Sequence, residues 1–381
     1  MISKFLLAVG LAVLMAVTGL SSYVYLGSRQ SKVVAPPQKP TAATPRAQAF
    51  VLPGTIYLEQ SGALYSFNAG RFHELTTESG WMQPALFPDG SRLLIVNRSA
   101  SYSDVYVMSL YGKMIAQITN NIAPARASAD TGAYAWSFYP RLSPDEHTLW
   151  TSYDGPKYVG AMYFDVDMAV WAAPYDGGIH QGRAWTTANT YTGGDIQPVP
   201  VPGGIIYTKY TYDENANRVG QLWFTNRAGS AGRALTSTAA GCSQAQLSPD
   251  GQKIAMICTY QKQVSYLTIA SWDGSSLGSL QTVVSNQLVA QPTWAPDGSG
   301  IAYLAPGGPA APFQLWFLPK NAYAPPIPSP VPTPSPTPGG PHNGPIPTPT
   351  PSPAPVVPVV KPIQVTFNLG FDATSPLAWL G

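Results

Sequence analysis

The chain has 381 residues, of which 10% are charged, and its formal net charge is +2 at pH 7 with no block of Lys or Arg. Nucleic-acid binding needs clustered basic residues that neutralise phosphates, so the composition excludes a DNA- or RNA-binding protein. Two Pro-rich stretches leave about 270 residues for folded structure, which is enough for one large domain.

The N-terminus predicts a membrane anchor. An uncharged run at 5–27 follows Lys4, and as a helix it is long enough to cross a hydrocarbon core of about 30 Å. A cleaved signal peptide is the alternative, but residues 19–22 make a poor cleavage site and apolar residues continue beyond them. We therefore expect residues 1–27 to form an uncleaved signal anchor, a single transmembrane helix in the cell membrane. The charges that flank the run are balanced and do not set its orientation.

Two segments have the composition of spacers. Residues 28–50 are rich in Pro, Ala and Thr without an apolar pattern, and residues 324–362 carry Pro at almost every second position. The longer segment favours polyproline II, at about 3.1 Å per residue, with a reach on the order of 100 Å. Bacterial Pro/Thr/Ser spacers of this kind usually lie outside the membrane, so we expect the domain at 51–323 to be extracytoplasmic.

One phrase recurs between the spacers. A full form is Gln-Pro-Thr-Trp-Ala-Pro-Asp-Gly, and five copies, one of them weakened, begin at residues 83, 139, 197, 244 and 291. Their spacing of roughly 47 to 58 residues is typical of propeller blades. In Pro-Asp-Gly, Pro sets φ near −65° and Gly takes the left-handed conformation that a three-residue hairpin loop needs. Each phrase therefore predicts the turn between the first two strands of a blade.

The runs after each turn predict the other strands. Short β-branched and aromatic segments such as 254–257 and 265–268 follow, and a second turn leads to a fourth strand, so each period supplies one four-stranded antiparallel blade. The first blade lacks an inner strand and the last lacks an outer one. Residues 363–367 and 375–379 fit these two vacancies. We therefore predict an all-β, six-bladed β-propeller closed by residues 363–381; the alternative is a loose tail with an open or five-bladed ring.

The repeated phrase, followed by Ile-Ala-Tyr and then Leu-Trp-Phe, resembles the TolB-type propeller repeat, also called the WD40-like or PD40 repeat. The similarity covers roughly residues 50–320 and the tail. It implies an extracytoplasmic β-propeller that binds other proteins of the cell envelope. The sequence departs from TolB because an anchor and a spacer, and no small α/β domain, precede the repeats, so the TolB partners do not carry over to it.

The two cysteines, Cys242 and Cys258, flank the turn at 249–251. With these three residues as the loop, the register places the cysteines opposite each other on neighbouring strands, at a Cα separation near 5.5 Å that permits a disulfide. A disulfide implies an oxidising, extracytoplasmic compartment. The alternative is a pair of buried thiols that act as small apolar side chains.

Catalytic and metal-binding motifs are weak. The Gly-x-Ser-x-Gly match at 274–278 lies between two predicted strands, whereas a serine hydrolase needs it between a strand and a helix, with Asp and His following. Residues 213–217 resemble the start of a calcium loop, but Arg218 stands where Gly is required. The histidines have no metal-ligand spacing. We expect no catalytic residue, metal or cofactor.

The candidate binding surface is the end of the blades at which the long loops emerge. The connections from the fourth strand to the next blade and from the second strand to the third share this end, whereas the turns at the other end are short. Long loops over a rigid scaffold and exposed aromatic rings are typical of recognition surfaces. The predicted binding residues are Trp136, Phe138, Tyr153, Lys157, Tyr158, Tyr163, Tyr191, Tyr210 and Tyr212. Packing of these rings on one another, without a ligand, is the alternative.

The sequence favours a membrane-anchored binding module whose partner is a protein or polysaccharide of the cell envelope. The rival hypothesis is a glycan-active or other hydrolytic propeller, which paired carboxylates about 5 to 9 Å apart in the central funnel would favour. Its candidate residues are Asp165, Asp167, Asp195 and Asp213. A third hypothesis is a structural or mechanosensing role in which the Pro-rich insert meets the partner.

Overall fold

The computed structural model describes residues 51–100, 102–121, 135–155, 168–176, 178–189, 191–260, 264–285, 287–324 and 360–381. These residues belong to one compact unit, Val51–Gly381, and are all-β apart from two 3-10 turns, η2 (Ile179–Gln181) and η3 (Lys320–Ala322). The predicted anchor, the first spacer and most of the Pro-rich insert lie outside the described residues. Within the described ranges, no helix is both long and apolar enough to span a membrane.

The strands form hydrogen-bonded sheets in which chain neighbours pair in antiparallel fashion. The first sheet contains β24 (Ala378–Leu380), β1 (Thr55–Gln60), β2 (Ala63–Asn68) and β3 (Arg71–Glu74). An eight-stranded sheet follows, with β4 (Trp81–Leu86), β5 (Arg92–Arg98), β6 (Ser103–Ser109), β7 (Met114–Gln117), β8 (Trp136–Leu142), β9 (Thr148–Asp154), β10 (Ala169–Pro174) and β11 (Arg183–Ala184). It consists of two four-stranded meanders joined by one parallel bridge, Ser103 to Trp136.

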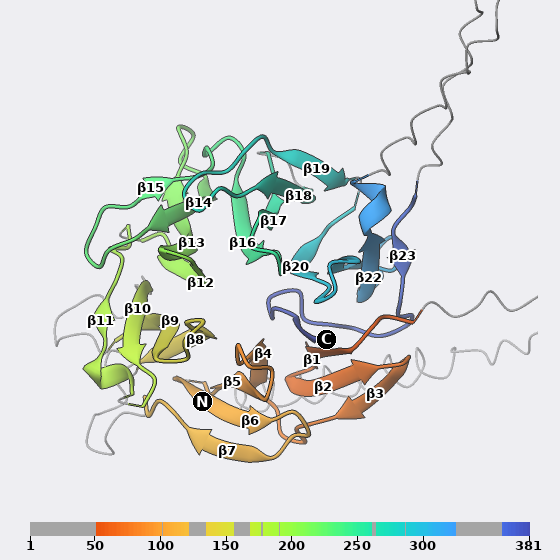
Figure 1. Ribbon diagram of the computed structural model, residues 1–381, viewed down its shortest axis with the longest axis horizontal. Helices are drawn as coiled ribbons and strands as arrows, with labels where there is room; N and C mark the ends of the chain where they lie inside the picture. The colour runs from red at the N-terminus through yellow and green to blue at the C-terminus, as the bar shows by residue number, and fades with distance from the viewer. Residues whose placement is uncertain are drawn as a thin grey trace, which may run out of the picture. The chain divides into compact units, whose positions relative to one another are not determined.

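Three further four-stranded meanders complete the described fold. The first contains β12 (Asp195–Val201), β13 (Gly204–Tyr212), β14 (Arg218–Thr225) and β15 (Arg233–Ala234). The second contains β16 (Cys242–Leu247), β17 (Lys253–Cys258), β18 (Tyr266–Ser271) and β19 (Gln281–Val284). The third contains β20 (Ala290–Trp294), β21 (Gly300–Pro306), β22 (Phe313–Pro319) and β23 (Ile363–Gln364). The meanders follow one another in chain order around a common centre, and β4, β8, β12, β16 and β20 lie innermost (Figure 1).

The Pro-Asp-Gly phrases form the predicted turns between the first and second strands of a meander. At 249–251 the amide of Gly251, in the left-handed region at φ 70°, donates to the carbonyl of Ser248 (2.8 Å). The carboxylate of Asp250 accepts hydrogen bonds from the Ser248 hydroxyl and the Gln252 amide, which lower the pKa of Asp250. Cys242 and Cys258 pair across this hairpin and form a disulfide, with their Cα atoms 4.1 Å apart.

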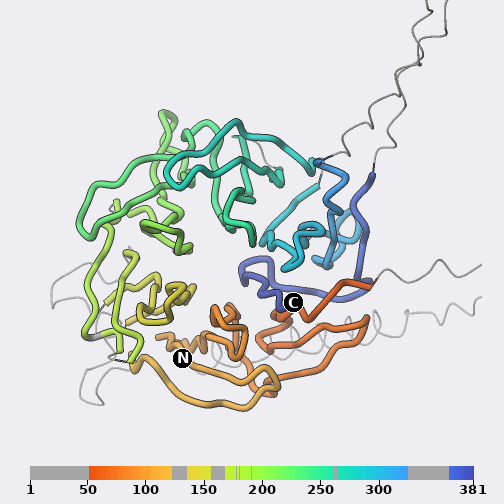
Figure 2. Tube along the Cα trace, viewed as in Figure 1, coloured from red at the N-terminus to blue at the C-terminus, as the bar shows by residue number. Residues whose placement is uncertain are grey.

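The C-terminal segment pairs with both ends of the folded chain. β23 pairs with β22, and β24 pairs with β1, so the blue C-terminal segment runs beside the first strand in Figure 2. β23 (Ile363–Gln364) is shorter than the strand predicted at 363–367, and β24 (Ala378–Leu380) begins later than the strand predicted at 375–379. Trp379 fixes the second of them, because its ring packs on Phe317 and its indole N–H donates to the carbonyl of Pro53 (2.7 Å).

The hydrophobic core lies between neighbouring sheets. One cluster joins residues of β12–β14, such as Leu222, to residues of β16–β18, such as Met256, and both side chains are fully buried. Another joins β1, β21 and β22 to the C-terminal segment through Leu58, Leu304 and Trp379. Burying one such aliphatic side chain contributes about 1.5 to 3 kcal/mol. Sheet-to-sheet packing therefore holds the inner strands at fixed positions around the centre.

Candidate functional site

The five innermost strands carry the same irregularity at the first residue of each repeated phrase. Gln83, Tyr139, Gln197, Gln244 and Gln291 have φ between 50° and 57°, a left-handed conformation that is uncommon for residues other than glycine. The pairing register of each strand shifts immediately after that residue. Such a β-bulge leaves the backbone amide of the bulged residue without a partner in its own sheet. The five amides are therefore available for bonds to neighbouring parts of the fold.

For four of these amides, a side chain of the preceding four-stranded meander accepts the hydrogen bond. The Gln83 side chain accepts from Tyr139 N (2.6 Å), the Gln197 side chain from Gln244 N (3.2 Å) and the Gln244 side chain from Gln291 N (2.6 Å). Tyr139 has no amide side chain, and the hydroxyl of Ser152 accepts from Gln197 N instead (3.1 Å). We call this series the amide relay. It links each inner strand to the next.

The C-terminal segment completes the amide relay between its last and first members. The Gln291 side chain donates to the carbonyl of Ala373 (2.9 Å), and the hydroxyl of Ser375 accepts from Gln83 N (2.8 Å). The segment thus occupies the place, between β20 and β4, that a sixth inner strand would take.

A narrow cavity lies inside the amide relay. Tyr139, Arg141, Gln197, Gln244, Gln291 and Pro376 are among its lining residues, and its volume of about 10 Å³ holds no more than about one water molecule. The guanidinium of Arg141 donates to the carbonyl of Pro140 (3.0 Å). Burial lowers the pKa of Arg141 to about 10, so this side chain is still a cation at neutral pH.

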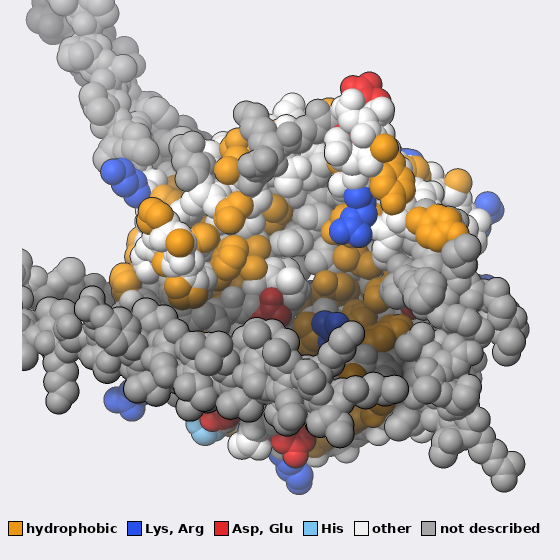
Figure 3. Space-filling model, turned by 180° about the vertical axis from the view of Figure 1, so that it is seen from behind, with side chains coloured by type: hydrophobic (Ala, Val, Ile, Leu, Met, Phe, Trp, Pro, Cys, Tyr) orange, Lys and Arg blue, Asp and Glu red, His pale blue; other side chains and the backbone are white. Residues whose placement is uncertain are grey.

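A wider cavity of about 370 Å³ opens at the end of the meanders where β4, β8 and β12 begin; we call it the funnel. Its lining residues are Met82, Gln83, Arg98, Phe138, Tyr139, Met168, Thr192, Gly193, Ile196, Tyr210, Arg218 and Thr374. None of these is Asp or Glu. Figure 3 shows a hollow near the middle of one face, with hydrophobic and basic side chains in it and an acidic side chain at its edge.

Strand ends position the charged and aromatic side chains of the funnel. Arg98 ends β5 and Arg218 begins β14, so both stand where a second strand meets a third. The guanidinium carbon of Arg218 lies 5.5 Å from the ring centre of Tyr210, and its Nη1 is 3.5 Å from the carbonyl of Thr192. The Phe138 ring stacks on Trp136 with ring centres 5.9 Å apart.

The predicted binding residues divide into four groups. Phe138 and Tyr210 line the funnel, and Trp136 supports Phe138 from behind. Tyr191 and Tyr212 are exposed and touch, because the Tyr212 hydroxyl donates to the Tyr191 carbonyl (2.6 Å).

Tyr153 is not on an exposed surface. It belongs to β9, is 6% exposed and packs edge-on against Trp171, so it is a core residue. Lys157, Tyr158 and Tyr163 lie outside the described residues.

The funnel also contains residues that sequence reasoning missed. Arg98, Arg218 and Met82 are far apart in the chain, and no local pattern marks them as neighbours. A signal for Tyr139 was present, since it occupies the first position of a repeated phrase, where the other copies have Gln.

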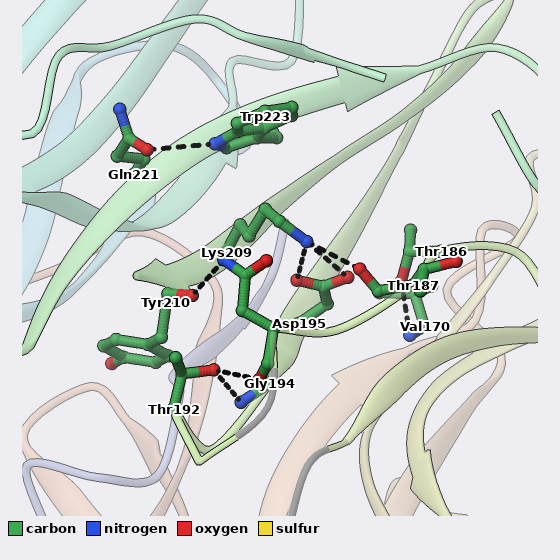
Figure 4. Close-up of polar contacts among 11 residues, drawn as sticks. Val170, Thr186, Thr187, Thr192, Gly194, Asp195, Lys209, Tyr210, Gln221 and Trp223 are labelled. Atoms are coloured by element: carbon green, nitrogen blue, oxygen red, sulfur yellow. Dashed lines mark hydrogen bonds and ion pairs between the residues drawn. The ribbon is translucent and has the colours of Figure 1, made fainter. Parts of the chain in front are cut away.

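The carboxylates of the rival hydrolytic hypothesis do not form a pair among the residues that the structure describes. Asp195 is fully buried and lies 3.1 Å from the ammonium group of Lys209, which also donates to the carbonyl of Thr187 (2.7 Å; Figure 4). Asp213 closes the β13–β14 turn by accepting hydrogen bonds from the amides of Asn215 and Asn217. Asp165 and Asp167 lie outside the described ranges.

Other catalytic arrangements are also missing from the described part of the chain. Ser276, in the Gly-x-Ser-x-Gly match, lies in the turn after β18, where its amide donates to Asp273. The described residues contain no group of three or more His, Cys, Asp or Glu side chains that could hold a metal ion.

Comparison with known proteins identifies the fold. No protein-family model matches the chain, and no curated protein sequence matches it. TolB from Acinetobacter baumannii superposes on 71% of this chain, with 14% identity and a TM-score of 0.52. The fold is that of a TolB-like β-propeller. The chain covers 62% of the length of that TolB.

Further solved structures belong to more than one class of protein. A putative TolB from Agrobacterium tumefaciens matches 70% of this propeller and is covered over 85% of its own length, at 15% identity and a TM-score of 0.48. A puromycin-hydrolyzing peptidase from Mycobacterium tuberculosis matches 74% of it and is covered over 48%, at 14% identity and a TM-score of 0.45. The superposition on TolB from Acinetobacter baumannii shows the fold alone, and the function is argued from the site.

Proposed function

We propose that the chain is a closed six-bladed propeller that binds a protein of the cell envelope in its funnel, on the outer side of the membrane. The observation that carries the proposal is the composition of the funnel, where Phe138, Tyr139 and Tyr210 stand beside two arginines. A few residues carry most of the binding energy at protein interfaces, and Trp, Tyr and Arg are enriched among them. The volume of about 370 Å³ also falls within the range of ligand pockets, about 300 to 1,000 Å³.

Two observations support six blades and a closed ring. The eight-stranded sheet consists of two four-stranded meanders, and β24 is the inner strand of the first sheet. Counted in this way, the strand order contains six four-stranded antiparallel groups. The amide relay passes through Ala373 and Ser375 between the last inner strand and β4. A ring that is bonded in this way presents its loops on a rigid frame, which is what a recognition surface needs.

The outer location is supported by the Cys242–Cys258 disulfide, because such bonds persist in oxidising compartments. The uncharged run at 5–27 would hold the chain in the membrane, and the spacer at 28–50 would separate the propeller from it. The TolB-like fold is consistent with an envelope protein, although folds alone do not determine partners.

Site-specific photo-crosslinking in the native cells tests this function. A photoreactive phenylalanine replaces Tyr212, which is 46% exposed beside the funnel, and as a control replaces Tyr111, which is 86% exposed in the β6–β7 turn. We expect Tyr212 to capture one protein that mass spectrometry identifies and that the Tyr111 position does not capture. Capture of the same proteins at both positions would contradict the proposal, and capture of polysaccharide alone would assign the funnel to a glycan.

A further inference from the structure

The two arginines of the funnel have no acidic partner in the described part of the chain. The ion pairs found there join Arg92 to Glu146 and Lys209 to Asp195. Arg98 and Arg218 are exposed, they line the funnel, and no carboxylate lines it with them. The rest of the surface is poor in charge, since only 10% of the residues of the chain are charged. A carboxylate near the funnel is that of Asp372, which accepts hydrogen bonds from the lining residue Thr374, so the two arginines leave the funnel with a net positive charge.

Arg218 is held in position before any ligand binds. Its guanidinium lies over the Tyr210 ring at 5.5 Å, and its Nη1 contacts the carbonyl of Thr192. These contacts use one face and one nitrogen of the group. The planar guanidinium has five N–H donors and binds carboxylates through two parallel hydrogen bonds. A side chain that is oriented in advance loses less entropy when it binds, which favours affinity.

A third cation, Arg141, follows Tyr139 by two residues on β8. Tyr139 lines both the funnel and the narrow cavity, and Arg141 lines the narrow cavity, where its guanidinium donates to the carbonyl of Pro140. Arg141 is partly buried, and the field of such a cation is screened less by water than the field of a fully exposed charge. Arg141 therefore adds to the attraction that an anion meets in the funnel.

The apolar residues that line the funnel restrict the class of anion that it can bind. Met82, Met168, Ile196 and Phe138 give the funnel an apolar wall. A polyanionic polysaccharide has few apolar groups to bury against that wall, whereas a peptide can carry carboxylates and apolar side chains together. We propose that the funnel binds an acidic peptide segment of the partner, whose carboxylates contact Arg98 and Arg218 while its apolar side chains pack on Phe138 and Met82. This assignment rests on the proposed function and names the chemistry of its ligand.

Selection from a random octapeptide library on the full-length protein in detergent tests the assignment. Asp and Glu should be enriched among the selected peptides, next to apolar residues. The best peptide is then labelled with fluorescein, and its dissociation constant is measured by fluorescence polarisation. Exchange of its Asp and Glu for Asn and Gln should weaken binding about tenfold or more, since hydrogen bonds to charged groups are the stronger ones. Added salt should weaken binding as well.

Variants of the protein locate the contact. Arg98→Gln and Arg218→Gln should each weaken the binding of the selected peptide about tenfold, and the double variant more. Arg71→Gln is the matched control, because Arg71 is an exposed arginine of the outermost strand β3, away from the funnel, and it should leave the affinity within about twofold. Circular dichroism of each variant establishes that the fold is retained.

Several outcomes would overturn the assignment. They are a selection without acidic enrichment, unchanged affinity in the double variant, and binding of polygalacturonate with no selected peptide bound. If Tyr212 captures a protein but the arginines do not affect peptide binding, the acidic-peptide assignment fails alone. If Tyr212 captures nothing specific, the proposed function fails with it.

Discussion

The backbone amide of Asp372 donates a hydrogen bond to the backbone carbonyl of Glu59 (3.3 Å), and this bond ties the C-terminal segment to β1. The Glu59 side chain is 5% exposed, and its Oε1 accepts a hydrogen bond from the amide of Gly62. Burial raises the pKa of Glu59 to about 7, and the nearby Asp372 carboxylate adds to the rise. The junction therefore depends on a carboxyl group that is protonated in mildly acidic solution.

Stability should fall as the pH rises through neutrality. Because the pKa of Glu59 is higher in the folded chain than its ordinary value of 4.5, protonation favours folding, and this contribution is complete below pH 4.5 and lost as the pH rises through about 7. A shift of this size corresponds to at most about 3 kcal/mol. Urea unfolding at pH 5 and pH 8 measures it. Glu59→Gln should remove this dependence, and an unchanged difference between the two pH values would refute it.

The disulfide between Cys242 and Cys258 should stabilise the propeller. The two residues are 16 positions apart, and closing a loop of this length in the unfolded chain contributes roughly 3 kcal/mol. The double variant Cys242→Ala/Cys258→Ala should therefore unfold at a lower denaturant concentration than the oxidised protein. Dithiothreitol should lower the midpoint of the parent protein and leave that of the double variant unchanged. Equal sensitivity of both proteins to the reductant would contradict this role.

Removing one acceptor of the amide relay should destabilise the fold by more than the net contribution of a typical hydrogen bond. In Gln244→Ala, the backbone amide of Gln291 loses its acceptor at a buried position, which costs about 1 to 3 kcal/mol. Gln252→Ala is the matched control, because Gln252 is an exposed residue of the neighbouring turn. Guanidinium unfolding monitored by tryptophan fluorescence compares the two. Similar losses in both variants would mean that the bond between sheets contributes little.

The ion pair of Asp195 and Lys209 should act on stability and not on ligand binding. Lys209→Met leaves a fully buried carboxylate without its cation and should destabilise the fold by about 3 to 5 kcal/mol. The double variant Asp195→Leu/Lys209→Met should recover much of that loss, because it buries no unpaired charge. Calorimetry measures both. If the double variant folds but no longer binds the partner captured at Tyr212, Asp195 has a functional role after all.

Features that depend on local sequence could be predicted, and features that depend on long-range packing could not. The turn at 249–251 follows from the local sequence. Spacing also predicted that Cys242 pairs with Cys258, but Leu247 and Ile254 beside the turn pair one residue out of that register, and the β-bulge after Ser243 restores it at the cysteines. Tyr153 was assigned to a loop, but β9 extends to Asp154 and the inward face of that strand buries the ring. Sequence spacing predicts where a strand is, and less reliably where it ends.

The two arginines of the funnel could not be predicted from the sequence. Arg98 and Arg218 are on β5 and β14, and only the circular arrangement of the sheets brings them to one cavity. The repeated Gln at the start of each phrase was visible as a pattern. Its purpose was not, because a left-handed φ at a residue other than glycine has no reliable sequence signal.

The pairing of β22 with β23 has a consequence for the long Pro-rich insert between them. The chain leaves the propeller after β22 and returns to the neighbouring strand of the same sheet, and Ala322 and Val360 line one groove there. Both ends of the insert are therefore attached to the same sheet of the fold. A protease that cuts it once would produce two polypeptides that separate in a denaturing gel but migrate together under native conditions, since each fragment supplies strands to the same sheet.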